Sequence, residues 1–161
     1  MDHSSLDVRR MTEAEYPVAA RLMERSISRL MPSHYPPDTL RWLIHHNQPD
    51  GIRARSVKQE DYLAWRGANA VGYLGIKRSE IGHLFVDPDA AGQGVGAFLV
   101  RFAEDLFRQR GHKTSLVLAS LNAAAFYERM GFQRTGDGSL DLAPGVRLPY
   151  VRMEKTLAVP V

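Results

Sequence analysis

The sequence contains no cysteine among its 161 residues. That absence excludes a disulfide framework, a thiolate metal site and a cysteine nucleophile. No uncharged apolar run is long enough to cross a bilayer, and the opening residues, MDHSSLDVRR, lack the apolar core of a signal peptide. We therefore expect a soluble, cytoplasmic protein that does not associate with membranes.

Blocks of like charge are also absent. The 21 basic residues are scattered among 18 acidic ones, and no aromatic-basic RNA motif occurs, so nucleic acid is not an expected partner. His45 and His46 are adjacent and diverge on a helix, and without a third ligand nearby they predict no metal site. A net charge of +3 suits an anionic small ligand.

The length fits one domain, residues 1–161, with a core over about 7–157. Apolar spacing predicts a strand at 7–11, a helix that begins at the capping box Thr12–Glu15, and a second helix after residues 36–38. Strands are expected within 61–77, at 80–86, 114–119, 132–135 and 148–157, and helices at 94–110 and 122–130. This order predicts the α/β class, with one mixed sheet covered by helices.

The helix at 94–110 has a predicted buried stripe. The stripe consists of Phe98, Leu99, Phe102, Leu106 and Phe107. Gly111 stands where a glycine commonly ends a helix. The last two strands are expected to be separated by a loop rich in Gly, Asp and Pro.

Small residues gather between the strand at 80–86 and the next helix, in the sequence DPDAAGQGVGA. A dinucleotide fingerprint, Gly92 to Ala97, is one interpretation, but DPDAA separates it from the strand and the following strand ends without a carboxylate. A plain tight turn does not explain so many small residues. Free backbone N–H groups at a helix N-terminus do explain them, because they form an anion site that glycine leaves open.

Two motifs carry a family resemblance. The first is Ala91-Gly92-Gln93-Gly94-Val95-Gly96, and the second is Ser120, Ala123, Phe126, Tyr127, Gly131 and Phe132 in the spacing S-x-x-A-x-x-F-Y-x-x-x-G-F. In order and separation they resemble the Gcn5-related N-acetyltransferase (GNAT) superfamily, over about residues 7–157 and most clearly over 80–132. The loop departs at Ala91, where Arg or Gln is usual, so one side-chain contact to phosphate is expected to be missing.

The resemblance implies a central mixed, mostly antiparallel sheet that is splayed in the middle, with helices on both faces. It implies an acyltransferase that uses acetyl-CoA as co-substrate and no metal. The diphosphate is expected on the loop, and the pantetheine arm is expected to pair with the neighbouring strand. The implied cofactor-binding residues are Leu84, Phe85, Val86, Ala91, Gly92, Gln93, Gly94, Val95, Gly96, Ala97, Ser120 and Asn122.

Tyr127 is the catalytic acid that the resemblance implies, protonating the departing thiolate. Glu80 is the candidate base, since it stands eleven residues before Ala91, where the histone-acetylating branch carries its glutamate. Strand alternation predicts that residues 80, 82, 84 and 86 share one face and that His83 points to the other. His83 is itself a candidate base, although a structural histidine is the preferred interpretation.

The acceptor is expected to be a primary amine, with its wall formed by residues 28–46, including Tyr35, and by the loop at 136–149. Relatives that acetylate ribosomal protein N-termini carry a glutamate where this sequence has Ser115, which favours a small-molecule amine. Three alternatives stay open: a protein or peptide amine as acceptor, a non-catalytic acyl-CoA-binding module, and a nicotinamide oxidoreductase. A homodimer also stays open.

Overall fold

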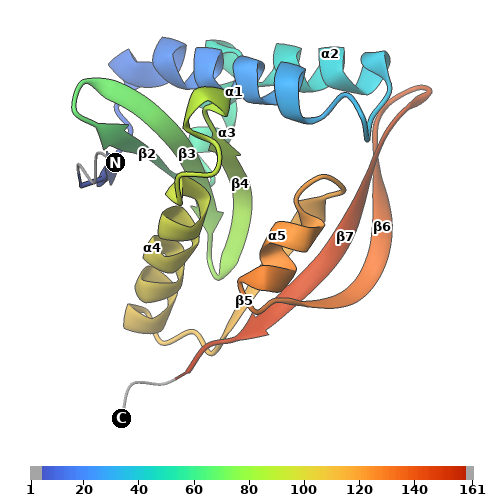
Figure 1. The fold of residues 1–161 in the computed structure, drawn as a ribbon. Helices are drawn as coiled ribbons and strands as arrows, with labels where there is room; N and C mark the ends of the chain where they lie inside the picture. The colour runs from blue at the N-terminus through green and yellow to red at the C-terminus, as the bar shows by residue number, and fades with distance from the viewer. Residues whose placement is uncertain (1–4, 159–161) are drawn as a thin grey trace.

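A seven-stranded mixed sheet forms the centre of the computed structural model, which describes residues 5–158 (Figure 1). The strands are β1 (Asp7–Arg10), β2 (Glu60–Arg66), β3 (Asn69–Lys77), β4 (Glu80–Val86), β5 (Thr114–Ser120), β6 (Gln133–Ala143) and β7 (Val146–Thr156). The helices are α1 (Tyr16–Leu30), α2 (Pro37–His46), α3 (Pro49–Ser56), α4 (Val95–Gln109) and α5 (Ala124–Arg129), with short 3-10 turns at Glu13–Glu15 and Pro88–Ala90.

The sheet is splayed between β4 and β5. The strand order is β1-β2-β3-β4-β5-β7-β6, and every neighbouring pair is antiparallel except β4 and β5. That parallel pair is short, since it joins only Glu80 to Leu116 and Ile81 to Val117. Beyond these residues the strands no longer pair, and we call this stretch the β4–β5 gap. The predicted mixed, mostly antiparallel, splayed sheet is confirmed.

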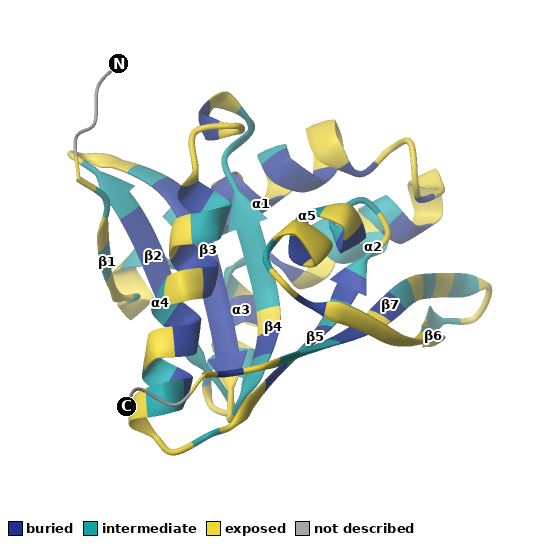
Figure 2. Cartoon of the chain, turned by 60° about the horizontal axis from the view of Figure 1, so that its bottom comes forward, coloured by how far each residue is buried: buried dark blue, intermediate teal, exposed yellow. Residues whose placement is uncertain are grey.

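Helices cover both faces of the sheet, as predicted. On one face, the α4 face, α4 and α5 pack on apolar side chains of the strands, including Leu74, Ile81 and Val117. On the other, the α1 face, α1, α2 and α3 cover Leu63 and Tyr73. Figure 2 shows the buried central strands between these two layers. The capping box is also confirmed, because the Thr12 backbone N–H donates to Glu15 Oε1 at 2.8 Å.

Two predictions of secondary structure are wrong. Helix α3 was not expected, because it is short and buries only Ile52, which leaves almost no periodic signal. The loop predicted at 136–147 is instead part of the long β6–β7 hairpin, whose β6 is an exposed edge strand. An edge strand tolerates glycine, and a Cβ at Gly138 would lie 2.3 Å from the Tyr150 hydroxyl oxygen of the paired strand.

The predicted buried stripe of α4 is also partly wrong. Phe98 is 40% exposed, whereas Leu99, Ala103 and Phe107 are fully buried. The stripe that packs on the sheet is centred near Ala103, so Phe98 lies at its margin, a quarter turn or more from the sheet. Gly111 does end the helix region in a left-handed conformation, with φ of +82°.

A buried ion pair fastens α4 to the last strand. The Lys155 ammonium of β7 lies 2.8 Å from Glu104 Oε2 of α4 and also donates to the carbonyl of Met130 at 2.7 Å. The Glu104 side chain is only 3% exposed. One lysine therefore connects α4, the end of α5 and β7 near the closed end of the β4–β5 gap.

Replacing Lys155 by Met is expected to lower the free energy of unfolding by about 3 kcal/mol, because Glu104 is left charged and buried without a partner. Urea denaturation measures this change. The matched control is the double variant Glu104→Gln with Lys155→Met, which removes both charges and should recover most of the loss. An equal loss in the single and double variants would contradict an electrostatic role for the pair.

Candidate active site

The main chain of β4 presents free hydrogen-bonding groups to the β4–β5 gap. The Asp87 N–H donates to the Val71 carbonyl at 2.9 Å, and hydrogen-bonded positions alternate along an antiparallel pair. Phe85, opposite Tyr73, therefore bonds to β3, while the main-chain groups of Leu84 and Val86 point toward the gap. Leu84, Phe85 and Val86 were expected to pair with an extended ligand. Because the main chain of Phe85 bonds to β3, only Leu84 and Val86 keep free main-chain groups for that pairing.

The facing edge on β5 is arranged in the same way. The Leu157 N–H donates to the Lys113 carbonyl at 2.8 Å, which begins the antiparallel pairing with β7. By alternation, the even-numbered residues of β5 direct their main chain toward β4. Ser120, the last of them, lies beyond the final β4–β5 pair, so its main-chain N–H faces the gap. The gap thus has unpaired main-chain groups on both sides.

A β-bulge in β4 corrects the predicted orientation of Glu80. His83 pairs with Gly75 and Ile81 pairs with Ile76, so Gly82 is an extra residue without a partner in β3. The bulge shifts the side-chain alternation by one position. Glu80, opposite Lys77, therefore lies on the α1 face together with His83, and not on the face of Leu84 as strict alternation predicted.

The glycine-rich loop leaves open space at its backbone. Gly92 and Gly94 have φ of +76° and +83°, and a Cβ at either position would meet no atom within 4 Å. The first helical bond of α4 is donated by Phe98 to the Gly94 carbonyl at 3.0 Å. The N–H groups of Val95, Gly96 and Ala97 therefore have no acceptor within the helix. Together with the helix dipole they have the arrangement that binds anions at helix N-termini, which makes this loop the candidate anion site.

Side chains fix this loop rather than filling it. Arg25 of α1 donates to Asp87 at 3.2 Å and to Asp89 at 2.6 Å, just before the glycines. Gln93 accepts a hydrogen bond from Arg66, so its amide is turned toward the β2–β3 hairpin. Ala91 is exposed and contributes no polar group. The donors that this loop offers to an anion are therefore main-chain N–H groups alone.

The hydrogen bond from Arg25 lowers the pKa of Asp89 from its ordinary value of 3.8. Because the pKa is lowered only in the folded state, the pairing stabilises the loop at pH values above the ordinary pKa of Asp89. Its contribution is lost as the pH falls through the lowered pKa. The loop anchor is therefore complete at neutral pH.

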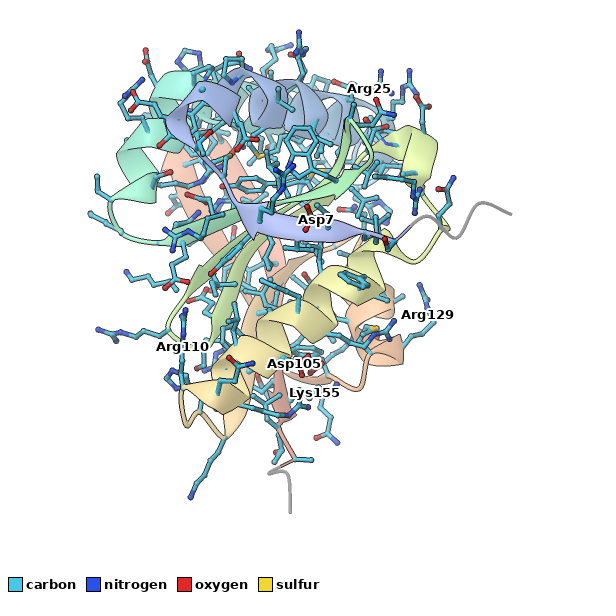
Figure 3. All side chains as sticks on the ribbon, turned by 90° about the vertical axis from the view of Figure 1, so that its left-hand side faces the viewer. Asp7, Arg25, Asp105, Arg110, Arg129 and Lys155 are labelled. Atoms are coloured by element: carbon cyan, nitrogen blue, oxygen red, sulfur yellow. The ribbon has the colours of Figure 1, made fainter. Side chains whose placement is uncertain are left out.

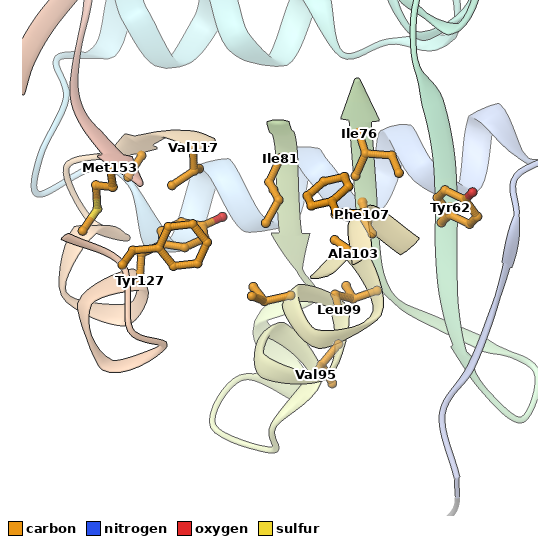
Figure 4. Close-up of a cluster of buried hydrophobic side chains, with 14 of the residues drawn as sticks. Tyr62, Ile76, Ile81, Val95, Leu99, Ala103, Phe107, Val117, Tyr127 and Met153 are labelled. Carbon is orange, nitrogen blue, oxygen red and sulfur yellow. The ribbon is translucent and has the colours of Figure 1, made fainter. Parts of the chain in front are cut away.

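Tyr127 lies on α5, across the gap from β4. It is 3% exposed, and its ring packs edge-on against Phe126 and Phe132, with centroid distances of 5.1 and 5.4 Å. Figure 4 shows its hydroxyl turned toward the side of the sheet where Ile81 of β4 lies. Burial raises the pKa of Tyr127, so the phenol stays protonated at neutral pH and is able to donate a proton.

The turn after β5 holds the other residues of the second motif. The half-buried Ser120 accepts the Ala123 N–H at its carbonyl, at 2.9 Å. The Oδ1 atom of Asn122 is buried and has no hydrogen-bond partner among residues 5–158. An acceptor without a partner is costly when buried, so this amide is available to a ligand that carries an N–H group.

Tyr35, expected on the acceptor wall, connects three parts of the chain. Its hydroxyl donates to the Pro149 carbonyl of β7 at 2.7 Å and accepts the Leu121 N–H at 2.9 Å. Thr39 of α2 donates to the Arg147 carbonyl at 3.0 Å. These bonds fasten the α1–α2 segment to the β6–β7 hairpin across the α1 face.

A buried polar network on the α1 face was not found from the sequence. The Tyr73 hydroxyl bonds to Asp61, which also accepts from Ser56 and Gln59 at 2.6 and 2.7 Å. His83 lies beside the ring of Tyr73, and burial together with the charge of Arg55 lowers the pKa of His83 to about 3. The hydrogen-bonded residues come from α3, β2 with the residue before it, and β3, and His83 adds β4 beside them, so no local spacing signals the network.

Comparison with known proteins identifies the family. The family model "Acetyltransferase (GNAT) domain" matches residues 32–157. The chain belongs to the GNAT acetyltransferase family, as the resemblance implied. It is therefore an enzyme of the acyltransferase class.

Among curated relatives, the peptidyl-lysine N-acetyltransferase YjaB of Salmonella typhimurium is 37% identical over 71 residues, which cover 44% of this chain and 48% of YjaB. The matched stretch thus spans about half of that relative's length.

Solved structures share the fold along nearly the whole chain. A GCN5-related N-acetyltransferase from Rhodopseudomonas palustris superposes with a TM-score of 0.89 at 26% identity, covering 98% of this chain and 99% of that one. PaiA N-acetyltransferase from Thermoplasma acidophilum, solved with coenzyme A, gives a TM-score of 0.75 at 16% identity, covering 94% and 99%.

Two features are absent from the described residues. In the part of the chain from residue 5 to residue 158, no three His, Cys, Asp or Glu side chains are grouped to hold a metal ion. None of the described helices has the length and apolar character needed to cross a membrane.

Gly94 offers a matched test of the anion site. Asn and Asp tolerate its left-handed conformation best among side chains, so both variants should fold, with unfolding free energies lowered by about 1 kcal/mol. Only Asp adds a negative charge at the start of α4. We expect Gly94→Asp to bind coenzyme A about tenfold more weakly than Gly94→Asn by calorimetry. Equal affinities would show that the anion lies elsewhere.

Proposed function

We propose that this protein is an acetyl-CoA-dependent N-acetyltransferase that moves the acetyl group to a primary amine by direct attack on the thioester. The observation that carries the proposal is the position of the unpaired N–H groups at the start of α4. They lie at the end of β4, beside a gap with free main-chain groups on both edges and a buried phenol on its far side.

The bound diphosphate accepts hydrogen bonds from the main chain of Gly92 to Ala97. The pantetheine arm lies in the gap as an extended segment and pairs with Leu84 and Val86, as a strand would. Asn122 Oδ1, which has no partner among the described residues, accepts from an amide of the arm, and Ser120 contacts the arm from the same β5 edge, opposite Leu84 and Val86. Coenzyme A bound to PaiA, which shares the fold, supports this choice of ligand.

The chemical step forms a C–N bond and breaks the C–S bond of the thioester. A main-chain N–H of Leu84 or Val86 stabilises the negative charge that develops on the carbonyl oxygen. Tyr127, whose phenol is protonated at neutral pH, gives its proton to the thiolate sulfur as the C–S bond breaks. The amine loses one proton to a base on the acceptor side.

Glu80 is the proposed base. The bulge at Gly82 places it on the α1 face, on the side of the sheet away from α4. His83 shares that face, but a pKa of about 3 makes its imidazole a weak base. Glu80 therefore accepts the proton, directly or through a water molecule.

The proposed acceptor is the amine of a small molecule that enters from the α1 face. Support comes from the hydrogen bonds of Tyr35 and Thr39, which hold α1–α2 against β7 on this side of the sheet. The second candidate is a peptidyl lysine, favoured by the likeness to the peptidyl-lysine N-acetyltransferase YjaB. A lysine side chain is itself a narrow primary amine, so both candidates fit the same approach.

Replacing Tyr127 by Phe is expected to lower turnover roughly 100-fold, the loss that accompanies removal of a general acid. The affinity for acetyl-CoA should stay within about twofold, because the ring still fills its place between Phe126 and Phe132. Stopped-flow thiol release and calorimetry measure the two quantities. Thermal unfolding serves as the control for an intact fold. Unchanged turnover would remove Tyr127 from the mechanism.

An acceptor screen tests the function itself. We expect free coenzyme A to be released from acetyl-CoA in the presence of a small amine, drawn from monoamines, polyamines and aminoglycosides. Lysine peptides form the comparison arm. Release of coenzyme A with lysine peptides alone would mean that the acceptor is a peptidyl lysine and not a small molecule. Binding of coenzyme A without release in any arm would indicate a non-catalytic acyl-CoA-binding module.

A further inference from the structure

A pocket that the proposed mechanism does not use lies between α4 and α5 on the α4 face. Its volume is about 430 Å³, within the range of roughly 300–1,000 Å³ that small-molecule sites occupy. Met130 contributes an apolar surface. The charged residues that line this α4–α5 pocket are Arg101, Glu104, Asp105, Arg108, Arg129 and Lys155.

The pocket carries two positive charges that no acid neutralises. Glu104 is paired with Lys155 at 2.8 Å, and Asp105 with Arg108 at 3.1 Å. Across residues 5–158, no carboxylate lies within ion-pair distance of Arg101 or Arg129. Figure 3 shows Arg129 on the side of α5, with Asp105 and Lys155 toward the lower end of α4. Two guanidinium groups in one pocket match a phosphate group in charge and geometry.

The pocket continues from the glycine-rich loop. Ala97 and Arg101 are four residues apart on α4, so they lie one above the other on the same side of the helix. Across from them, the ring of Phe126 lies 3.2 Å from a Cβ placed at Gly96. Arg129 follows Phe126 by three residues on α5 and projects from the same face. Both arginines therefore stand one turn beyond the N–H groups at the start of α4.

We propose that the α4–α5 pocket binds the phosphomonoester on the ribose of coenzyme A, with Arg101 and Arg129 as its partners. This assignment rests on the proposed function, which places the diphosphate at Gly92 to Ala97. The 3′-phosphate is one ribose away from the diphosphate and carries close to two negative charges at neutral pH. The two arginines also supply the positive charge that Ala91 does not bring to the loop.

The experiment compares coenzyme A with 3′-dephospho-coenzyme A by calorimetry. The wild type should bind coenzyme A at least about tenfold more tightly, the contribution of one charge-assisted hydrogen bond. Arg101→Gln and Arg129→Gln should each lose about tenfold in affinity for coenzyme A and leave the dephospho ligand unchanged. Arg129→Lys should recover part of the loss, because it keeps the charge without the planar donor pair.

Arg21→Gln is the matched control. Arg21 is an exposed residue of α1, on the face of the sheet opposite the pocket. Its substitution removes the same single charge. It should affect neither ligand. Equal affinity of the wild type for both ligands would overturn the assignment, and so would a parallel loss for both ligands in the arginine variants. A folded wild type that binds neither ligand would overturn the proposed function instead, so the two failures are distinguishable.

Discussion

The interrupted pairing of β4 and β5 is the constraint on which the rest of the structure depends. After Ile81 and Val117, two strands in the middle of a sheet have edges without partners. A buried main-chain donor or acceptor that lacks a partner costs about 1–3 kcal/mol, so an interior edge requires something to pair with it. Water satisfies such groups, but an extended chain with alternating amides satisfies them with the geometry of a strand. The main chain of the fold alone thus supplies an interior strand edge whose geometry suits a linear ligand.

Contacts on both faces fix the positions of the two halves of the sheet on either side of the gap. On the α4 face, Val95 and Leu99 of α4 press on β3 so closely that a Cβ at Gly72 would lie 2.7 Å from Leu99 Cδ1. On the α1 face, Tyr35 joins α1–α2 to β7 through hydrogen bonds of 2.7 and 2.9 Å. At the closed end, Lys155 links α4 to β7. Since these ties come from three elements, the width of the gap is a property of the fold and not of one contact.

The sequence predicted the elements with strong local signals. The bounds of β4 were correct, and those of the helix after the glycines were correct to one residue at each end, because a proline, a glycine cluster and helical spacing mark them within a few residues. The bulge at Gly82 was not predictable, because register depends on the partner strand and not on β4 alone. That one extra residue moved Glu80 to the other face. The polar network around Asp61 was missed for a similar reason, since it joins α3, β2 and β3.

The two faces of the sheet differ in how the sequence encodes them. The α4 face presents main-chain donors to its ligand, and main-chain geometry needs particular residue types at fixed spacing, which a pattern reveals. The α1 face is assembled from side chains distant in sequence: Thr39 reaches the carbonyl of Arg147, 108 residues away, and Tyr35 reaches that of Pro149, 114 residues away. A change in α2 or in the β6–β7 hairpin alters that wall without touching the glycine loop. Under the proposed function, the acceptor can therefore diverge while the main-chain site for the acyl donor stays the same, and the choice of amine is decided on the α1 face.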